Sequence, residues 1–337
     1  MEFEAEATTV NFGRSIIVPS VQELTNETII NVPPRYVRTD QDPPSVTADT
    51  WLPSVPLIDL QKLVDGVHAD ELERLHSACR EWGFFQVINH GVSSSLLEKL
   101  KFEIENFFKI PYEEKKKLWQ VADNHEGFGQ LFVVSEEQKL DWETLESYSA
   151  EMKKLAMTIL GHMAKALRMD GEEMRDLFSD GVQSMRMNYY PPCPQPDKVI
   201  GFSPHSDADA LTILLQLDDI QGLQIRNQGR WVPVNPLPNA FVVNIGDIME
   251  IVSNGIYRSI EHRALVNSSK ERLSIATFYS SRLDSELGPA PSLIGPSNPA
   301  IFRRMPLEEY FKEFFARRLN GKAYLDFMRV DLNKVNN

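Results

Sequence analysis

The chain has 337 residues, of which 42% are apolar, enough to fill a sizeable core in one large domain or two. Its formal net charge of −13 argues against a surface for nucleic acid or anionic membranes. The two cysteines, Cys79 and Cys193, are too few for a disulfide framework or a cysteine metal site. The acidic N-terminus lacks a signal pattern, and no apolar run reaches membrane-span length. We therefore expect a reduced, cytoplasmic, monomeric protein with no nucleic-acid or membrane partner.

Hydrophobic periodicity gives the elements in chain order. Residues 1–50 show no sustained pattern, and residues 40–50 are typical of a linker. Periodicity then predicts a strand, a helix and a second strand, at residues 56–60, 69–80 and 83–88, and two further helices, one opening at Ser93 and one over residues 143–169.

From residue 184 to 279 the pattern changes to short strands separated by turn residues, which is typical of a double-sheet jelly roll. A last amphipathic helix is predicted to start at Pro306 and to end before Gly321. The expected fold is mixed α+β, a jelly-roll core (double-stranded β-helix) flanked by helices.

Three residues have the types and order of a mononuclear iron site. His205 and Asp207 are separated by one residue, so an extended strand would point both the same way. His262 lies far downstream, on a predicted strand face that it shares with Ile260 and Ala264. Two histidines and one carboxylate on one face of Fe(II) leave coordination positions open, as in non-haem oxygenases. The predicted metal ligands and catalytic residues are His205, Asp207 and His262.

A second set of residues suits an anionic ligand. Alternation places Arg272, Ser274 and Phe278 on one face of a strand. A buried arginine needs an anionic partner, and its planar fork suits a carboxylate held by two hydrogen bonds. Upstream, a strand that ends at a proline-rich turn carries Asn188 and Tyr190 on one face, aimed at the same cavity.

The chain resembles the plant 2-oxoglutarate- and Fe(II)-dependent dioxygenases, of the branch with SRG-type proteins and opiate O-demethylases. The matching motifs are VPLIDL (55–60), CREWGFFQVINHG (79–91), EGFGQ (126–130), NYYPPCPQP (188–196), LPNAFVVNIGD (237–247) and NGKAYL (320–325). The resemblance implies Fe(II) at His205, Asp207 and His262. It also implies 2-oxoglutarate at Arg272 and Ser274, with Asn188 and Tyr190 assisting.

What the resemblance implies for function is hydroxylation or O-demethylation of a plant specialised metabolite with O2, releasing succinate and CO2. Ascorbate is the expected reductant. Phe278, Arg186 and Phe128 are the expected substrate contacts. Related flavonoid oxidases have a lysine where Arg186 stands and an acidic residue where Ser280 stands, which weakens a flavonoid assignment.

The family also implies a division of the chain. Residues 1–50 form an N-terminal extension, 51–170 the dioxygenase N-terminal helical region, 171–290 the Fe(II)/2-oxoglutarate jelly roll, and 291–337 a C-terminal helical closure. Between Trp142 and Glu143, roughly thirty residues that relatives have are absent, more than an ordinary loop deletion. In relatives this segment supplies a barrel edge and part of the substrate wall.

Two alternatives stay open. One is a catalytically impaired relative that binds metal or metabolite, inactive because of the missing segment. The other is a cupin-type metal protein without 2-oxo-acid chemistry, which leaves Arg272 and Ser274 unexplained. The remaining histidines and a phenylalanine cluster are predicted to be structural or surface residues: His68, His76, His90, His125 and His162, and Phe311, Phe314 and Phe315.

Overall fold

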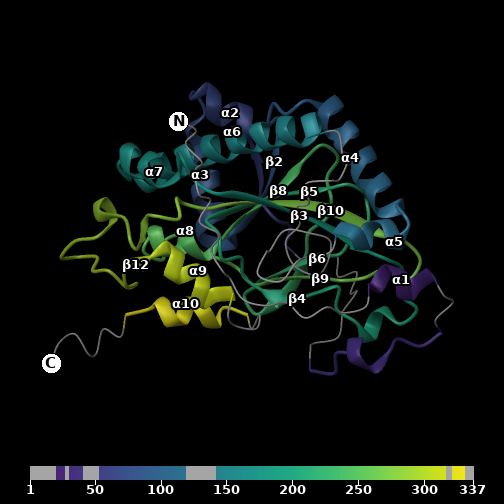
Figure 1. Ribbon diagram of the computed structural model, residues 1–337. Helices are drawn as coiled ribbons and strands as arrows, with labels where there is room; N and C mark the ends of the chain where they lie inside the picture. Colours follow the sequence, from purple (N-terminus) through teal and green to yellow (C-terminus); the bar gives the residue numbers. More distant parts are fainter. Residues whose placement is uncertain (1–19, 27–29, 41–52, 119–141, 316–320, 331–337) are drawn as a thin grey trace, which may run out of the picture.

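Two main β-sheets and a layer of helices make up the part of the chain that the computed structural model describes, residues 20–26, 30–40, 53–118, 142–315 and 321–330 (Figure 1). The large sheet has the strand order β1-β2-β8-β5-β10-β3, and the small sheet has the order β4-β9-β6-β7. Apart from the parallel pair β1 and β2, neighbouring strands in both sheets are antiparallel. This arrangement confirms the predicted jelly-roll core.

The central strands of the large sheet are buried on both faces, because helices cover one side of the sheet and the small sheet lies on the other (Figure 1). Every residue of β8 and β10 is buried, whereas every residue of the edge strand β3 is only partly buried. The strand bounds are β1 Leu57–Asp59, β2 Phe84–Ile88, β3 Gln183–Tyr190, β4 Phe202–His205, β5 Leu211–Gln216, β6 Leu223–Asn227, β7 Arg230–Pro233, β8 Phe241–Ile245, β9 His262–Ala264, β10 Arg272–Tyr279, β11 Glu286–Leu287 and β12 Met305–Pro306.

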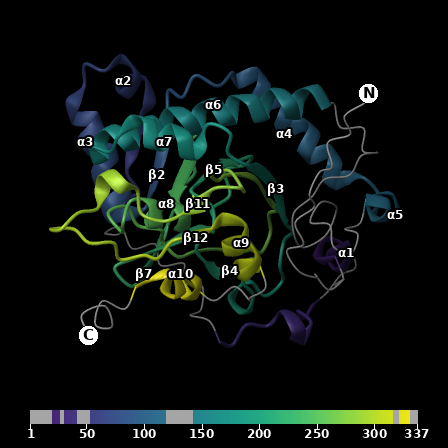
Figure 2. The ribbon, with the colours of Figure 1, turned by 60° about the vertical axis from the view of Figure 1, so that its left-hand side comes forward.

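The longest helix, α6, lies over the large sheet together with α3 and α4 (Figure 2). Its residues Tyr148, Met152, Leu155, Ile159 and Met163 recur at helical spacing and are all buried. The helix bounds are α1 Val21–Asn26, α2 Leu60–Asp65, α3 Ala69–Ser77, α4 Ser94–Lys109, α5 Tyr112–Lys115, α6 Trp142–Leu167, α7 Gly171–Phe178, α8 Asp247–Val252, α9 Leu307–Phe315 and α10 Ala323–Met328. In the described residues, no helix is both long and apolar enough to cross a membrane.

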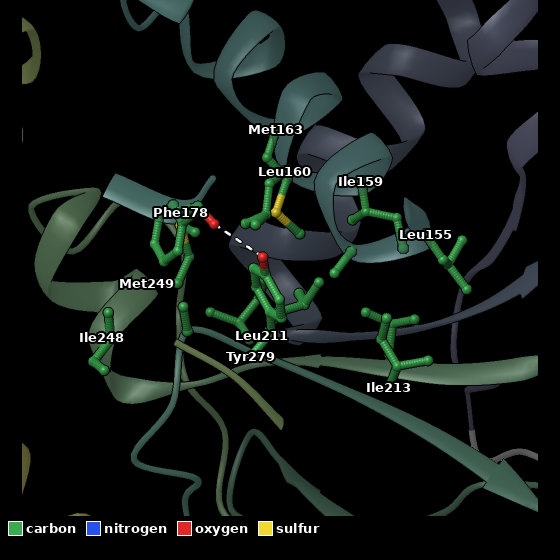
Figure 3. Packing of buried hydrophobic residues seen from close by; sticks show 14 of the residues in the cluster. Leu155, Ile159, Leu160, Met163, Phe178, Leu211, Ile213, Ile248, Met249 and Tyr279 are labelled. Atoms are coloured by element: carbon green, nitrogen blue, oxygen red, sulfur yellow. Dashed lines mark hydrogen bonds between the residues drawn. The ribbon is translucent and has the colours of Figure 1, made fainter. Parts of the chain in front are cut away.

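The main core joins α6 and α7 to the large sheet (Figure 3). Ile159 and Met163 of α6 belong to the same cluster as Leu211 and Ile213 of β5. Removing each such side chain from water contributes about 1.5–3 kcal/mol. The Tyr279 hydroxyl donates a hydrogen bond of 2.9 Å to the Phe178 carbonyl, so the polar end of a buried aromatic has a partner. This core fixes β5 and β10, the two strands that carry much of the site.

The ends of several elements differ from the predictions. Pro306 closes the two-residue strand β12, paired with Glu286, and the helix α9 starts only at Leu307. The helix α10 was not predicted separately. Ser93 precedes α4 as expected, but its hydroxyl contacts Ser95 and caps no backbone amide. The helix α6 begins at Trp142, so the proposed junction after this residue falls inside a helix; Phe128 and His125 lie outside the described residues.

Candidate metal and cosubstrate site

The two histidines and the aspartate predicted to bind metal come together in the small sheet. His205 ends β4 and is the cross-strand partner of His262, the first residue of β9. Asp207 Oδ1 lies 3.4 Å from His205 Nε2 and 3.6 Å from His262 Nε2. One ligand atom from each residue fits within 4.8 Å of the others, and all three residues are buried.

The local backbone differs from the prediction. Strand β4 stops at His205 and has an irregular register with β9 before it, so Asp207 lies in the loop that follows. The strand alternation expected to align His205 with Asp207 is therefore wrong. The loop instead turns Asp207 back toward the histidines. The backbone carbonyl of Asp207 accepts a hydrogen bond of 2.8 Å from the Asp247 amide at the start of α8.

Backbone carbonyls fix the orientation of both imidazole rings. His205 Nδ1 lies 2.7 Å from the Ser203 carbonyl, and His262 Nδ1 lies 3.2 Å from the Ile260 carbonyl. A carbonyl only accepts, so each Nδ1 carries the proton and donates it. The Nε2 lone pair of each ring is then left for a metal, the usual arrangement around ligating histidines.

The Asp207 carboxylate is oriented in the same way. Its Oδ2 accepts hydrogen bonds from Thr212 Oγ1 at 2.6 Å and from Asn244 Nδ2 at 2.8 Å, which leaves Oδ1 facing the histidines. Burial raises the pKa of the Asp207 carboxyl, but His262, His205 and the Thr212 hydrogen bond outweigh burial and hold the pKa below its ordinary range. Burial and the neighbouring His205 lower the pKa of His262 to about 4. Near neutral pH the set is therefore an ionised carboxylate with a neutral His262, the protonation states that metal binding requires.

The donor set fits Fe(II). Two imidazole nitrogens and one carboxylate oxygen converge from one side, which leaves further positions for exchangeable ligands. Among the residues that the structure describes, no other three histidine, cysteine, aspartate or glutamate side chains come this close.

The residues predicted to hold a carboxylate face one another across β3 and β10. Arg272 pairs with Tyr190, and Ser274 pairs with Asn188, whose Nδ2 lies 3.5 Å from Ser274 Oγ. The Arg272 side chain is buried, and its Nη2 donates to Gln216 Oε1 at 3.1 Å, but its Nε is buried without an acceptor. An unpaired N–H on a buried guanidinium is costly and fits a site that receives an anion.

Room for this guanidinium depends on Gly222. A Cβ at residue 222 would lie 2.7 Å from Arg272 Cδ and 3.0 Å from its Nε. A Cβ atom essentially never lies within 3.0 Å of a non-bonded heavy atom, so any residue larger than glycine would displace the Arg272 side chain. The glycine thus matters for its missing side chain and not for a special backbone angle.

Comparison with known proteins agrees with this geometry. Residues 181–281 match the 2OG-Fe(II) oxygenase superfamily, and residues 55–158 match the N-terminal region of the non-haem dioxygenases in morphine synthesis. The chain belongs to this family. It is a 2-oxoglutarate-dependent dioxygenase, an oxidoreductase that uses iron, 2-oxoglutarate and O2 on a small molecule, so the cupin alternative is discarded.

Individual relatives cover almost the whole dioxygenase. Protein SRG1 of Arabidopsis thaliana is 53% identical over 94% of this chain and 97% of its own length. Codeine O-demethylase of Papaver somniferum is 48% identical over 95% of this chain and 98% of its own. The crystal structure of JOX2 in complex with 2OG, Fe and JA has a TM-score of 0.81 and 32% identity, and covers 93% of this chain and 98% of that one. The SRG1 alignment spans 348 positions, more than the 337 residues here, so that relative has residues without a counterpart in this dioxygenase.

Two of the three expected substrate contacts lie beside the metal-binding residues. Phe278 is buried on β10, on the strand face of Arg272 and Ser274. Arg186 lies on the face of β3 that also carries Asn188, with its Cζ 4.3 Å from the Phe202 ring centroid. The Phe202 ring in turn is 4.4 Å from the His205 ring. Burial lowers the pKa of Arg186, partly offset by Tyr190 and Asp207. The third, Phe128, lies outside the described residues.

Several supporting residues of the dioxygenase were missed from sequence. Thr212 and Asn244 orient Asp207, Gln216 holds Arg272, and Gly222 leaves room for it. A polar residue within an apolar strand, as Asn244 is in β8, was the available signal. His76 and His90 have structural hydrogen bonds, to the Tyr257 hydroxyl at 3.1 Å and the Asn239 carbonyl at 3.2 Å.

Proposed function

We propose that this dioxygenase hydroxylates or O-demethylates a plant specialised metabolite, with release of succinate and CO2. The convergence of His205, Asp207 and His262, together with an Arg272 guanidinium whose buried Nε has no acceptor, carries the proposal. The relatives support it, since they include demethylases named for codeine, thebaine and a flavonoid. Iron and 2-oxoglutarate, with O2, supply the oxidising chemistry when bound, and ascorbate is the reductant we expect.

The side chains have separate tasks in this proposal. His205, Asp207 and His262 hold Fe(II), with the two imidazoles oriented by backbone carbonyls. Arg272 and Ser274 bind the distal carboxylate of 2-oxoglutarate, and Asn188 and Tyr190 assist from β3. Holding the distal carboxylate fixes the orientation of the whole cosubstrate. Positioning of this kind lowers the reaction barrier by several kcal/mol. The buried surroundings exclude water from the bound groups.

Arg186 and Phe278 are proposed to receive the organic substrate. Within the described ranges no carboxylate forms an ion pair with Arg186, and its guanidinium stacks on Phe202. A partly buried cation of this kind favours a substrate oxygen, such as a carbonyl, phenol or carboxylate, placed near the metal residues. Phe278 supplies an apolar surface for a ring system, and Phe128 remains a predicted contact.

The test is an anaerobic titration of the apoprotein with Fe(II) and then 2-oxoglutarate, watching for the visible charge-transfer band of the chelated complex. We expect a saturable band that is lost in His262→Ala and weakened in Arg272→Ala. Arg226→Lys, at an exposed ion pair with Glu261, is the matched control and should behave like the wild type. A folded protein without a band would overturn the proposal.

One observation favours a second candidate, an impaired relative that binds ligands without productive turnover. The curated relatives align over spans longer than this chain, so they have residues that it lacks. Consumption of 2-oxoglutarate without matching product formation across a metabolite panel would favour this candidate. The domain boundaries, the monomeric state and the cytoplasmic location stay predictions.

A further inference from the structure

A carboxylate that the proposed chemistry does not use contacts Ser280, two residues after Phe278. Asp209 stands in the loop between β4 and β5, and its Oδ1 accepts a hydrogen bond of 2.6 Å from Ser280 Oγ. Ser280 directly follows β10, so this hydrogen bond joins the metal-site loop to the end of that strand.

The direction of this pair follows from the strand register. Phe278 pairs with Thr212, whose hydroxyl contacts Asp207, so their shared face looks toward the metal residues. The ladder continues past β10, because the Ser280 amide donates to the Val182 carbonyl at 2.9 Å and the Ala210 amide donates to the Tyr279 carbonyl at 3.0 Å. Two residues after Phe278, Ser280 therefore points to the same face, and it brings the Asp209 carboxylate with it.

Asp209 is not used by an internal cation. In the described part of the chain, no lysine, arginine or histidine forms an ion pair with it, and Ser280 is its one side-chain donor. The residue is partly buried, and in the described residues its carboxylate accepts a single side-chain hydrogen bond, so it retains acceptor capacity for a further donor. A carboxylate beside an aromatic surface, with a single neutral donor, gains from a further N–H or O–H group.

We propose that Asp209 selects the organic substrate by accepting a hydrogen bond from its hydroxyl or protonated amine. This inference rests on the proposed function and names its substrate class: methylated or hydroxylatable ring compounds with a hydrogen-bond donor remote from 2-oxoglutarate. Along β10 the order is Arg272, then Ala276 opposite Arg186, then Phe278, then Ser280 with Asp209. The substrate ring lies over Phe278, with its acceptor oxygen toward Arg186 and its donor toward Asp209.

The test measures binding of four probes to the anaerobic protein loaded with Fe(II) and 2-oxoglutarate, by titration calorimetry. Codeine has an amine and a hydroxyl, thebaine an amine only, 7-O-methylapigenin phenolic hydroxyls only, and 4′,5,7-trimethoxyflavone neither. We expect the wild type to bind donor-bearing probes at least about tenfold more tightly than trimethoxyflavone, the usual size of a hydrogen bond to a charged group.

Variants separate charge from hydrogen bonding. Asp209→Ala should lower the affinity for the donor-bearing probes about tenfold and leave the affinity for trimethoxyflavone unchanged. Asp209→Asn keeps a hydrogen-bond acceptor but loses the charge. It should therefore lower the affinity for thebaine, whose donor is a protonated amine, more than the affinity for 7-O-methylapigenin, whose donors are neutral hydroxyls. Ser280→Ala removes only the hydrogen bond to the carboxylate, so it should reduce the affinity for donor-bearing probes less than Asp209→Ala does. The control is Asp219→Asn, at an exposed position after β5, which should bind all probes like the wild type.

The charge-transfer band of each variant keeps this inference apart from the proposed function, because the band reports iron and 2-oxoglutarate without any organic probe. A normal band with selective loss of donor-bearing probes supports the role of Asp209. Equal binding of all four probes by the wild type, equal weakening of all probes in Asp209→Ala, or loss of the band in that variant overturns it. The last result would make Asp209 a support for the Asp207 loop.

Discussion

The Asp207 carboxylate divides its two oxygens between different partners. Oδ1 faces the histidines, and Oδ2 is held by Thr212 and Asn244. Such hydrogen bonds to a ligating carboxylate fix its direction before the metal arrives, and removing one usually costs about 10–100-fold in metal affinity. Thr212→Val keeps the shape of the side chain and removes the donor. We expect Fe(II) affinity to fall about tenfold in anaerobic calorimetry.

The control for this change is Thr158→Val on α6, a partly buried threonine remote from the metal residues in sequence, whose hydroxyl donates to the Lys154 carbonyl at 2.8 Å. It should leave Fe(II) affinity at the wild-type value. Unchanged affinity in Thr212→Val would show that Asn244 alone orients the carboxylate.

A substitution at Gly222 should weaken cosubstrate binding without affecting metal binding. In Gly222→Ala the new methyl group would meet Arg272 Cδ at 2.7 Å, so the guanidinium has to move. We expect the Kd for 2-oxoglutarate to rise about tenfold, because a misplaced fork loses one of two charge-assisted hydrogen bonds. The measurement is the charge-transfer titration, and Fe(II) affinity should stay constant. Gly295→Ala, where a Cβ meets nothing within 4 Å, is the matched control. A parallel loss of Fe(II) affinity would contradict this separation.

At the scale of elements, Gly83 joins the N-terminal helical region to the segment that leads into β9. It has a positive φ of 61°, and a Cβ there would lie 2.2 Å from the Arg258 carbonyl oxygen and 2.4 Å from Ile260 Cγ1. Gly91 has a similar φ of 78° but nothing within 4 Å of its Cβ position. The two glycines therefore separate backbone strain from steric overlap.

We expect Gly91→Ala to cost about 1 kcal/mol of unfolding free energy, from the left-handed backbone alone. Gly83→Ala should cost at least about 2–3 kcal/mol more, because strand β2 must move away from residues 258–260. Denaturant unfolding of both variants measures this difference. Equal costs would mean that the segment before His262 yields easily, and β2 would then not position β9.

Elements differ in how far the sequence predicts them. The face of β10 that carries Arg272, Ser274 and Phe278 followed from alternation, since the strand is regular over its full length. Strand β4 is short and irregular, so alternation does not extend to Asp207, although Asp207 does lie beside the two histidines. Pro306 has the backbone preference of a first helical residue but pairs with Glu286 instead. Gly222 and Thr212 act on partners from other strands, and single-sequence patterns do not reveal such register.

At the scale of the whole molecule, the site is assembled from segments far apart in the chain. The C-terminal segment also takes part, because Gly321 forms a β-bridge with His205. Behind it, Lys322 Nζ and Arg329 Nη2 lie 2.7 and 3.0 Å from the two oxygens of the buried Glu250 carboxylate. The same Glu250 accepts from the Ser259 amide at 2.8 Å, three residues before His262. The metal-site strands are therefore tied to α8 and to the C-terminal segment, and ligands bound there should stabilise the entire fold.

This linkage gives a prediction on thermal stability. A ligand that binds only the folded state at 100 times its Kd adds about 2.7 kcal/mol to the unfolding free energy. Under anaerobic conditions, Fe(II) should raise the Tm of the apoprotein, and 2-oxoglutarate should raise it again only when Fe(II) is present, because the cosubstrate chelates the metal. His262→Ala should lose both increases, whereas Arg272→Lys should keep the first and lose most of the second, since lysine lacks the planar fork. Arg226→Lys should keep both. If 2-oxoglutarate stabilises the iron-free protein as strongly as the iron-loaded one, it binds through Arg272 without the metal, and the two-step assembly of the site is wrong.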